Sequence, residues 1–422
     1  MPKLSKCHFM ATFVAAAALM AGTQQVHAAG FQLKEQSAEG QGNSFAGSTA
    51  KAYDASTIFY NPAGMARLEG NQFQANASLI MPSAEYKHES STRTAGGTLF
   101  NDTNDNGGVS AVVPSLYGVY EINDKLKVGV SVNTPFGLST EYKDDWIGAQ
   151  YNILSKIETI TTTPTVSYRI SPQLSFGVGL QIQYLGGELT RKANPIIGGD
   201  VELKADDMGV GATFGVLYEY NDHSRVGLSY RSRVNHTLDG HVQIANATNP
   251  AANTYYRAEA DLTTPDIISF GWYHELDEKW AVMSDIAWTN WSVFDELRVR
   301  DKVGTRADSV TTYKWDDTMF YSLGVNYKYD DQWKFQTGIA YDEGAANDEH
   351  RTAGIPDSDR YWLSVGTEYK MNDSMTWNIG YSHLWGADGK VNEDSKATGG
   401  SSYVGTFESH VNIVTAGVNI SF

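Results

Sequence analysis

The chain has 422 residues, a formal net charge of −17 at pH 7, 12% aromatic residues and 40 glycines. The acidic balance argues against a nucleic-acid partner, because nucleic-acid binding depends on clusters of Lys and Arg. Beyond residues 1–28 the sequence contains no apolar run of the roughly 18 residues that a membrane-spanning helix needs. A soluble secreted β-protein and a membrane β-barrel share this composition, so the periodicity has to decide between them.

Residues 1–28 are predicted to be a signal peptide for export. The segment has a short lysine-containing start and an apolar stretch over residues 10–20, and it ends on the small residue Ala28. The only cysteine of the chain, Cys7, lies inside it. Because a stray thiol is a hazard in the oxidising periplasm, a mature chain without cysteine fits an exported protein.

Residues 29–69 do not alternate and are rich in Gly and Ala. Irregular backbone survives at membrane depth only where protein encloses it, so we predict a plug, or hatch, inside a barrel. A disordered periplasmic tail is the alternative, which Ile58, Phe59 and Met65 disfavour because they need burial. Within this segment Asn61-Pro62-Ala63 forms a candidate hatch motif that reads locally as a turn, and a simple bend remains an alternative.

From residue 70 onward, one local pattern occurs six times: an aromatic-rich strand end, a short polar turn and then a strict alternation. The turns recur at intervals of about fifty residues, whereas turn signals in a soluble sandwich recur every 8–12 or so. This interval fits long strands joined alternately by a short turn and a long loop. The six turns cover residues 121–125, 169–173, 219–223, 275–279, 328–332 and 370–374.

The strand that follows residues 169–173 illustrates the alternation. Apolar residues from Leu174 to Tyr184 occupy every second position, and small or polar residues such as Gly177 and Gln181 lie between them. A soluble sandwich would turn the apolar face inward, whereas a barrel in lipid turns it outward and leaves no unpaired edge. Strand length, Tyr and Trp crowded at the turn ends and the terminal Phe422 favour the barrel.

We therefore predict an all-β protein: a transmembrane antiparallel β-barrel of 14 strands over residues 70–422, with the N-terminal plug in its lumen. An even strand number places both barrel ends on the periplasmic side. The expected location is the cell outer membrane of a Gram-negative bacterium, which the chain would cross many times. The long loops would then face the outside, among them 90–108, 142–155, 190–205 and 342–357.

Pro135, Phe136 and Gly137 interrupt a strand that otherwise alternates cleanly. Proline cannot donate to a strand ladder, and a closed barrel has no edge at which to place it. The predicted result is a kink with unpaired backbone and a lateral opening in the wall. The alternative is that the strand ends early and Pro135 already belongs to the outer loop.

Two predicted outer loops carry apolar residues that are candidates for ligand binding. Exposed apolar loops are costly unless they cover each other or contact an apolar ligand, and both alternatives remain open. The candidates are Trp146, Ile147, Tyr151, Leu154, Ile196 and Ile197.

No motif in the sequence predicts catalysis or metal binding. Gly-x-Ser-x-Gly and His-Glu-x-x-His are absent. Residues 102–107 match the first half of a calcium loop, but Val113 stands where the bidentate Glu is required. We expect a protein that is not an enzyme, with no cofactor and no metal site. An outer-membrane lipase remains an alternative, because catalytic groups can lie far apart in sequence.

Several segments resemble the FadL family of outer-membrane transporters for long-chain fatty acids and other hydrophobic compounds. The resemblance spans essentially the whole mature chain. The segments that carry it are Ala29-Gly30-Phe31-Gln32-Leu33, Asn61-Pro62-Ala63, Ser229-Tyr230-Arg231-Ser232, Trp288-Thr289-Asn290-Trp291-Ser292 and residues 355–364.

The resemblance implies a fourteen-stranded barrel with a hatch and a passive route for an apolar ligand. The ligand would be caught in a groove among the outer loops and pass to a pocket near Phe31 and Leu33. It would leave sideways through a gap at the strand kink, Pro135-Phe136-Gly137. The implied partners are hydrophobic small molecules, fatty acids or hydrocarbons, together with outer-membrane lipid and lipopolysaccharide. The barrel-assembly machinery would recognise Phe422.

The resemblance further implies basic side chains inside the barrel that hold a carboxylate. Where the family usually has a Lys-Asp pair, this chain has Lys314-Trp315-Asp316-Asp317. Arg191 and Lys314 are candidate carboxylate anchors, and Arg231 and Arg233 are further candidates. Uptake of uncharged aromatic or aliphatic hydrocarbons is therefore an alternative to fatty acid transport. A general porin would not need the N-terminal plug, and an adhesive barrel would not explain the kink.

Overall fold

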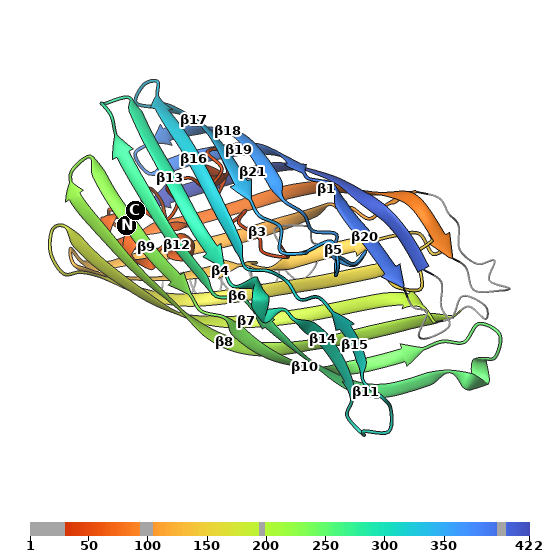
Figure 1. Cartoon of the computed structure of the whole chain (residues 1–422). Helices are drawn as coiled ribbons and strands as arrows, with labels where there is room; N and C mark the ends of the chain where they lie inside the picture. Colours follow the sequence, from red (N-terminus) through yellow and green to blue (C-terminus); the bar gives the residue numbers. More distant parts are fainter. Residues whose placement is uncertain (1–29, 93–103, 194–198, 395–401) are drawn as a thin grey trace.

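The computed structural model describes residues 30–92, 104–193, 199–394 and 402–422. The described strands join a single sheet that closes on itself as an antiparallel barrel (Figure 1). Several spanning strands are divided into two elements, and the closed barrel has 14 strands, which confirms the predicted fold class. The predicted signal peptide, residues 1–28, lies outside the described residues.

The elements have the following bounds. The helices are α2 (Ala38–Gln41), α3 (Thr57–Tyr60), η1 (Pro62–Arg67), η2 (Pro250–Ala252) and η3 (Trp291–Val293). The strands are β1 (Gln72–Thr92), β2 (Asp105–Asn106), β3 (Ala111–Asn123), β4 (Leu126–Asn133), β5 (Gly137–Glu141), β6 (Leu154–Arg169), β7 (Leu174–Lys192), β8 (Asp200–Asn221), β9 (Ser224–Arg231), β10 (Val234–Ile244), β11 (Thr254–Thr264), β12 (Ile267–Glu275), β13 (Trp280–Thr289), β14 (Glu296–Asp301), β15 (Ser309–Thr312), β16 (Thr318–Lys328), β17 (Trp333–Asp342), β18 (Arg360–Asn372), β19 (Met375–Gly386), β20 (Gly389–Asp394) and β21 (Ser402–Ser421). No helix among the described residues is long and apolar enough to cross a membrane.

The barrel closes where the last strand, β21, pairs with the first, β1. This pairing runs from Gln72 opposite Ser421 to Thr92 opposite Ser402. All six predicted turns join adjacent strands: β3 to β4, β6 to β7, β8 to β9, β12 to β13, β16 to β17 and β18 to β19. The short turns lie at one end of the barrel in Figure 1, and β10, β11, β14 and β15 extend from the other end.

Several strands continue beyond the ends that the alternation predicts. The predicted loop 190–205 is shorter in the structure, because β7 ends at Lys192 and β8 begins at Asp200. Cross-strand ion pairs occur in this outer part, such as Lys204 with Glu188 at 3.1 Å. Outside lipid both faces of a strand can be polar, so the alternation of period two that marks a strand is lost there.

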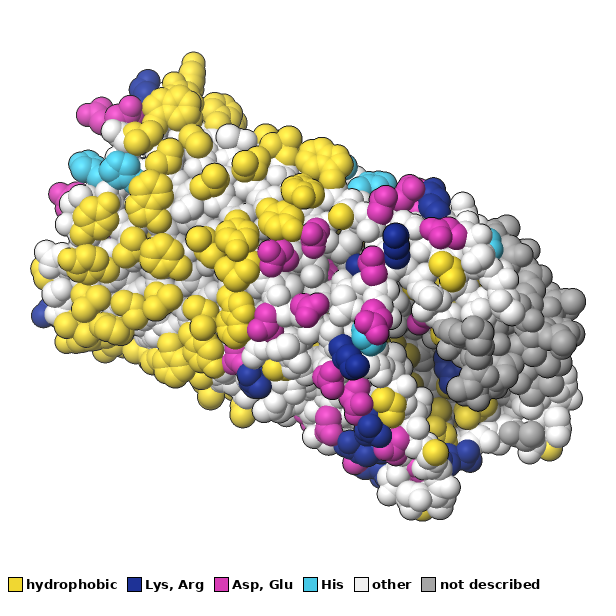
Figure 2. Space-filling model, viewed as in Figure 1, with side chains coloured by type: hydrophobic (Ala, Val, Ile, Leu, Met, Phe, Trp, Pro, Cys, Tyr) yellow, Lys and Arg dark blue, Asp and Glu magenta, His cyan; other side chains and the backbone are white. Residues whose placement is uncertain are grey.

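The apolar side chains of the alternating strands point outward, as they do in a barrel surrounded by lipid. On β7, Phe176 and Leu180 are 41% and 51% exposed, whereas Gln181 and Gln183 between the apolar positions are buried inside. Figure 2 shows apolar side chains covering the half of the visible face nearest the short turns, and charged side chains gathered over the other half. An outward apolar band on a closed sheet is the arrangement of an outer-membrane barrel.

The segment from Gly30 to Gly70 lies within the barrel (Figure 1) and is almost wholly buried. Its element η1 contacts β6, β7 and β8, and α2 contacts β18, β19 and β21 on another side of the lumen. Because the strands enclose this irregular backbone, the lumen is occupied by protein.

The lipid-facing position of Leu180 provides a test of the orientation. We expect Leu180→Arg to destabilise the folded barrel by about 2–4 kcal/mol, the cost of a charge on the lipid face near the bilayer midplane. Leu276→Arg is the matched control, because Leu276 lies in a short turn and is 59% exposed, where a charge costs about 0–1 kcal/mol. Denaturant unfolding in lipid vesicles measures both. Equal losses for the two variants would contradict the assignment of the lipid face.

Candidate functional site

The third spanning strand is interrupted at the predicted kink. β4 ends at Asn133 and β5 begins at Gly137, and both elements pair with β6. Asn133 lies opposite Thr161, and Gly137 lies opposite Glu158. The kinked strand therefore uses one more residue than β6 over this interval, which is the geometry of a β-bulge and bends the strand.

The kink also ends the pairing with the preceding strand. β3 and β4 pair from Asn123 as far as Leu116 opposite Val132, and the next bridge between these parts of the chain joins Gly108 to Thr140. Within the described part of the wall, no strand pair is formed across this seam between those two points. The backbone of the kink has to find other partners.

Those partners come from the N-terminal segment. Leu33 N donates to Pro135 O at 2.8 Å, and Gly137 N donates to Phe31 O at 2.7 Å. Gln32 and Phe136 form an antiparallel bridge between the two hydrogen bonds. Residues 31–33 therefore pair with the kink as a short strand would, and they close the backbone ladder that Pro135 breaks.

The side chain of Phe31 is the centre of an aromatic cluster. The centre of its ring lies 4.7 Å from the ring centre of Trp291, 5.5 Å from that of Phe294 and 6.0 Å from that of Phe136, and these rings meet edge to face. Trp315 completes the cluster at 5.8 Å. Phe31 is fully buried here. The sequence singled out Phe31 and Phe136, but it gave no role to the ring of Trp291, Phe294 or Trp315.

The residue before Phe31 has to be glycine. Gly30 has φ +58°, and a Cβ there would lie 2.7 Å from the Trp291 ring. Its amide donates to Asp357 Oδ2 at 3.0 Å, and Ala345 N donates to the same oxygen at 2.6 Å. Asp357 also forms a buried ion pair with Arg360, with Oδ1 and Nη2 3.0 Å apart. Loop residues far along the chain thus hold the N-terminal segment in place.

Burial shapes the charges around this segment. It raises the pKa of Asp357, which Arg360 and the amides of Gly30 and Ala345 lower. Burial also raises the pKa of Glu35 to about 7, against the lowering effects of its backbone hydrogen bond and of Arg360. Arg360 therefore serves as the local counter-charge for acids that would otherwise favour the protonated form.

An apolar cavity, here called the outer cavity, borders the aromatic cluster. It encloses about 570 Å³ when the space open to solvent is counted. Among the described residues that line it, only Lys156 is charged, and Lys156 is paired with Glu158 at 3.0 Å. Several of its walls, among them Leu138, Leu185 and Leu262, belong to the same packed cluster as Phe31. The lining residues are Leu138, Ser155, Lys156, Ile157, Leu185, Gly187, Leu189, Leu203, Ala205, Leu238, Ala260, Leu262, Phe294, Leu297, Tyr313 and Ile355.

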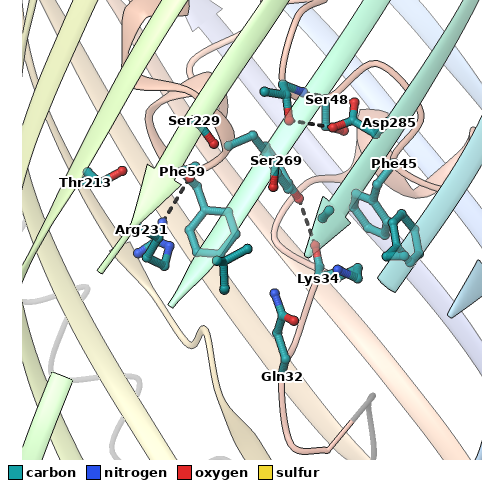
Figure 3. Close-up of a pocket in the computed structure, with 15 residues that line it drawn as sticks. Gln32, Lys34, Phe45, Ser48, Phe59, Thr213, Ser229, Arg231, Ser269 and Asp285 are labelled. Carbon is teal, nitrogen blue, oxygen red and sulfur yellow. Dashed lines mark hydrogen bonds between the residues drawn. The ribbon is translucent and has the colours of Figure 1, made fainter. Parts of the chain in front are cut away.

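A second cavity, here called the inner cavity, lies between the hatch and the barrel wall (Figure 3). It encloses about 590 Å³ on the same measure and is more polar. Gln32 and Lys34 line it, so the N-terminal segment presents one face here while Phe31 points into the aromatic cluster. The other lining residues are Phe45, Ser48, Thr49, Phe59, Tyr60, Thr213, Ser229, Arg231, Ile267, Ser269, Asp285, Ala287 and Phe320.

The predicted loop residues gather in a different place. Trp146 and Ile147 are buried, Trp146 stacks on Tyr142 at 4.3 Å, and Tyr151 packs against the same cluster. Leu154 is half-buried at the start of β6. None of these four residues lines the outer or inner cavity. Ile196 and Ile197 lie outside the described residues.

The candidate carboxylate anchors Arg191 and Lys314 both lie on the exposed surface. Arg191 Nη1 is 3.4 Å from Gln150 O, and Lys314 has φ 44° with its carbonyl accepting from Asn347 Nδ2 at 2.9 Å. Neither residue lines the outer or inner cavity. The basic residues that do line them are Lys34, Lys156 and Arg231, of which the sequence had suggested only Arg231.

The hatch motif fastens the plug to the wall. Asn61 Nδ2 donates to Thr49 O at 2.7 Å and to Val216 O at 3.0 Å, and Asn61 Oδ1 accepts from Ala63 N at 3.1 Å. Pro62 follows at the first position of η1, where a missing amide hydrogen costs nothing. The motif therefore caps a helical turn and binds β8 with the same side chain.

Glycines of the wall allow this close approach. A Cβ at Gly215 would lie 2.0 Å from Asn61 Oδ1, and one at Gly177 would lie 2.3 Å from the carbonyl carbon of Pro62. These glycines occupy inward positions on β8 and β7. Sequence reasoning placed Gly177 on the polar face of its strand but could not identify what it touches.

Over the described ranges, no group of three or more His, Cys, Asp or Glu side chains is placed to hold a metal ion. What the geometry does provide is an apolar cavity, an aromatic cluster around a terminal segment and a break in the barrel wall.

The chain is similar in sequence to known outer-membrane transport proteins. A family model described as outer membrane protein transport protein (OMPP1/FadL/TodX) matches residues 19–422. A long-chain fatty acid transport protein of Salmonella typhi is 31% identical over 403 residues, covering 87% of this chain and 90% of that protein. The protein of that name from Escherichia coli K12 is 30% identical over 433 residues, covering 92% and 94%.

Solved structures show the same fold. A Pseudomonas aeruginosa FadL homologue superposes with a TM-score of 0.87 at 23% identity, covering 93% of this chain and 100% of that one. The Pseudomonas putida toluene transporter TodX gives 0.71 at 16% identity, covering 94% and 100%. Fold and site together define an outer-membrane β-barrel transport protein closed by an internal hatch. The chain belongs to the OMPP1/FadL/TodX family of outer-membrane transport proteins.

The close contact at Gly215 predicts what holds the lumen shut. We expect Gly215→Ala to displace Asn61 and loosen the hatch, raising the ion conductance of the reconstituted protein, because the added Cβ would overlap Asn61 Oδ1. Gly187→Ala is the matched control, since the nearest atoms to its Cβ would be 3.9 Å away. Conductance in planar bilayers measures the effect. If both variants conduct like the unaltered protein, the glycine contact does not hold the hatch.

Proposed function

We propose that this protein transports hydrophobic molecules passively across the outer membrane, with long-chain fatty acids as its main substrates. The observation that carries the proposal is the pairing of residues 31–33 with the kink, next to an apolar cavity that shares its packing with Phe31. The names of the relatives from Salmonella typhi and Escherichia coli support the substrate class. No catalytic step and no cofactor take part in this proposal.

The proposed route begins among the outer loops around Trp146 and continues into the outer cavity. Movement of the segment carrying Phe31 and Leu33 then releases the backbone of Pro135 and Gly137. The ligand leaves sideways through the seam between β3 and β5 into the membrane. An apolar chain gains about 0.8 kcal/mol per CH₂ by staying out of water, which favours a lateral exit over an aqueous pore.

The proposal also assigns the parts of the chain. Residues 1–28 are removed as a signal peptide, residues 29–69 form the hatch and residues 70–422 form the barrel. Removal of the signal leaves Ala29 as the first residue, next to the Gly30 amide that Asp357 holds. Outer-membrane lipid and lipopolysaccharide surround the barrel, and the assembly machinery recognises the strand that ends at Phe422.

A second candidate function is uptake of uncharged aromatic or aliphatic hydrocarbons by the same route. The outer cavity favours it, because Lys156, the one charged residue in the described part of its lining, is already paired with Glu158. The toluene transporters with the same fold show that this barrel type accommodates such a role in other proteins.

Uptake in cells without their own fatty acid porter tests the route. We expect the protein to confer uptake of labelled oleate, and the triple variant Pro135→Ser, Phe136→Val, Gly137→Ser to abolish it by restoring a regular alternating strand. The single variant Phe136→Val is the control, because it keeps the proline and the glycine that break the strand. Protein amount in the outer membrane is compared by immunoblot.

The outcomes separate the candidate functions. Uptake of toluene without oleate would keep the route and change the substrate to hydrocarbons. Unchanged oleate uptake by the triple variant would rule out exit through the kink. Passage of small sugars, with neither oleate nor toluene entering, would replace hydrophobic transport by a porin function.

A further inference from the structure

The inner cavity carries an excess of positive charge. Its charged lining residues are Lys34, Arg231 and Asp285. Thr49 satisfies Asp285 by donating its backbone amide to Oδ2 at 3.2 Å and its hydroxyl to Oδ1. Arg231 donates to Gln181 Oε1 at 2.6 Å and to Phe59 O at 2.9 Å, which are neutral acceptors. Neither basic residue of this cavity therefore has a carboxylate partner in the described part of the chain.

Lys34 is the less satisfied of the two cations. Its ammonium lies 4.2 Å from the centre of the Phe320 ring, and in the structure as described its Nζ has no ion-pair or hydrogen-bond partner. Removal from water lowers the pKa of Lys34, and the nearby carboxylates of Asp342 and Glu35 raise it. A half-buried ammonium without an acceptor is costly, and an anion in the cavity would remove that cost.

Ser48 provides a second unsatisfied group in the same cavity. The residue is 5% exposed and lines the cavity, and its hydroxyl has no hydrogen-bond partner among the described residues. Buried hydroxyls are normally hydrogen-bonded, so the Ser48 hydroxyl can donate to a polar group that enters the cavity. Phe45, Phe59 and Phe320 give the cavity apolar surface as well.

The outer cavity differs in the state of its cation. Lys156 is paired with Glu158 at 3.0 Å, so the outer cavity has no free charge to offer an anion. Ile267 lines the inner cavity and belongs to the cluster around Phe31, which also forms walls of the outer cavity. The hydrophobic cluster that contains Phe31 and Ile267 therefore borders both cavities, the apolar outer one and the cationic inner one.

We infer that the inner cavity is a binding site for the carboxylate end of an anionic amphiphile, with Lys34 as its counter-charge and Ser48 as a hydroxyl donor. Phe45, Phe59 and Phe320 contact the methylene groups next to the carboxylate. This inference rests on the proposed transport function and makes the inner cavity the place where acids are distinguished from uncharged hydrocarbons. Lys34 is then a specificity-determining residue, although the sequence presents it only as part of a hatch.

The test compares an acid with its neutral counterpart. Binding of oleate, methyl oleate and toluene to the purified full barrel in detergent is measured for the unaltered protein, Lys34→Met, Lys34→Arg and Lys156→Met. We expect Lys34→Met to lose about tenfold or more of its oleate affinity, the value of a charge-assisted hydrogen bond, with methyl oleate binding unchanged. Lys34→Arg should keep most of the oleate affinity. Lys156→Met is the comparison variant in the outer cavity, and it should change the affinities for oleate and methyl oleate alike, because Lys156 is already paired with Glu158.

Each of the following results would contradict the inference. If Lys34→Met keeps its oleate affinity, or loses affinity for oleate and methyl oleate equally, Lys34 does not bind the carboxylate. An oleate-selective loss in Lys156→Met, and not in Lys34→Met, places the anchor in the outer cavity. Binding of toluene alone by the unaltered protein leaves the hydrocarbon form of the proposed function intact, whereas binding of none of the three ligands removes that function too. Heat stability of Lys34→Met is measured in parallel and should not fall, because the variant removes a half-buried ammonium that has no acceptor.

Discussion

The backbone of a strand in a membrane has to be satisfied within the protein, and in this barrel the N-terminal segment meets that requirement at the kink. Pro135 cannot continue the ladder, and the chain between Asn133 and Gly137 turns away from β3. An unpaired amide or carbonyl facing hydrocarbon costs several kcal/mol. Residues 31–33 supply the missing partners by pairing inside the barrel. The wall and the terminal segment therefore depend on each other.

This dependence links the two cavities. An extended segment presents successive side chains to opposite sides, so Phe31 enters the aromatic cluster while Gln32 and Lys34 face the inner cavity. A movement of the segment that frees the kink would also change what both cavities contact. The apolar tail and the charged head of an amphiphile would thus meet different faces of one element, which a uniform pore could not provide.

The periodicity of the sequence was sufficient to predict the barrel but not the contacts in its lumen. Alternation and short polar turns are local signals, and all six turns and the strand number are correct. The inward positions carry small or polar residues whose partners are far away in sequence. Asp357 binds Gly30 across 327 residues, and Asn61 binds Val216 across 155. No local pattern marks such pairs. The carboxylate anchors Arg191 and Lys314, which the family resemblance suggested, stay a prediction, and the structure places neither of them in the lining of the two cavities.

The strengths of the contacts argue that the terminal segment moves and the rest of the hatch stays. The deeper hatch is held by buried charges: Lys51 pairs with Glu39 at 2.6 Å, and Arg225 donates to Ala50 O and Lys51 O. Breaking a buried ion pair costs about 3–5 kcal/mol, and losing the hydrogen bonds around it adds to that. Residues 31–33 are held to the kink by two backbone hydrogen bonds, worth about 0.5–1.5 kcal/mol each, and by aromatic packing that an apolar ligand can replace. An apolar ligand entering the outer cavity can therefore offset the cost of displacing Phe31, but it cannot replace the buried ion pair between Lys51 and Glu39 in the deeper hatch. On the proposed route, this difference favours movement of the ligand toward the seam beside β3 over movement into the lumen below.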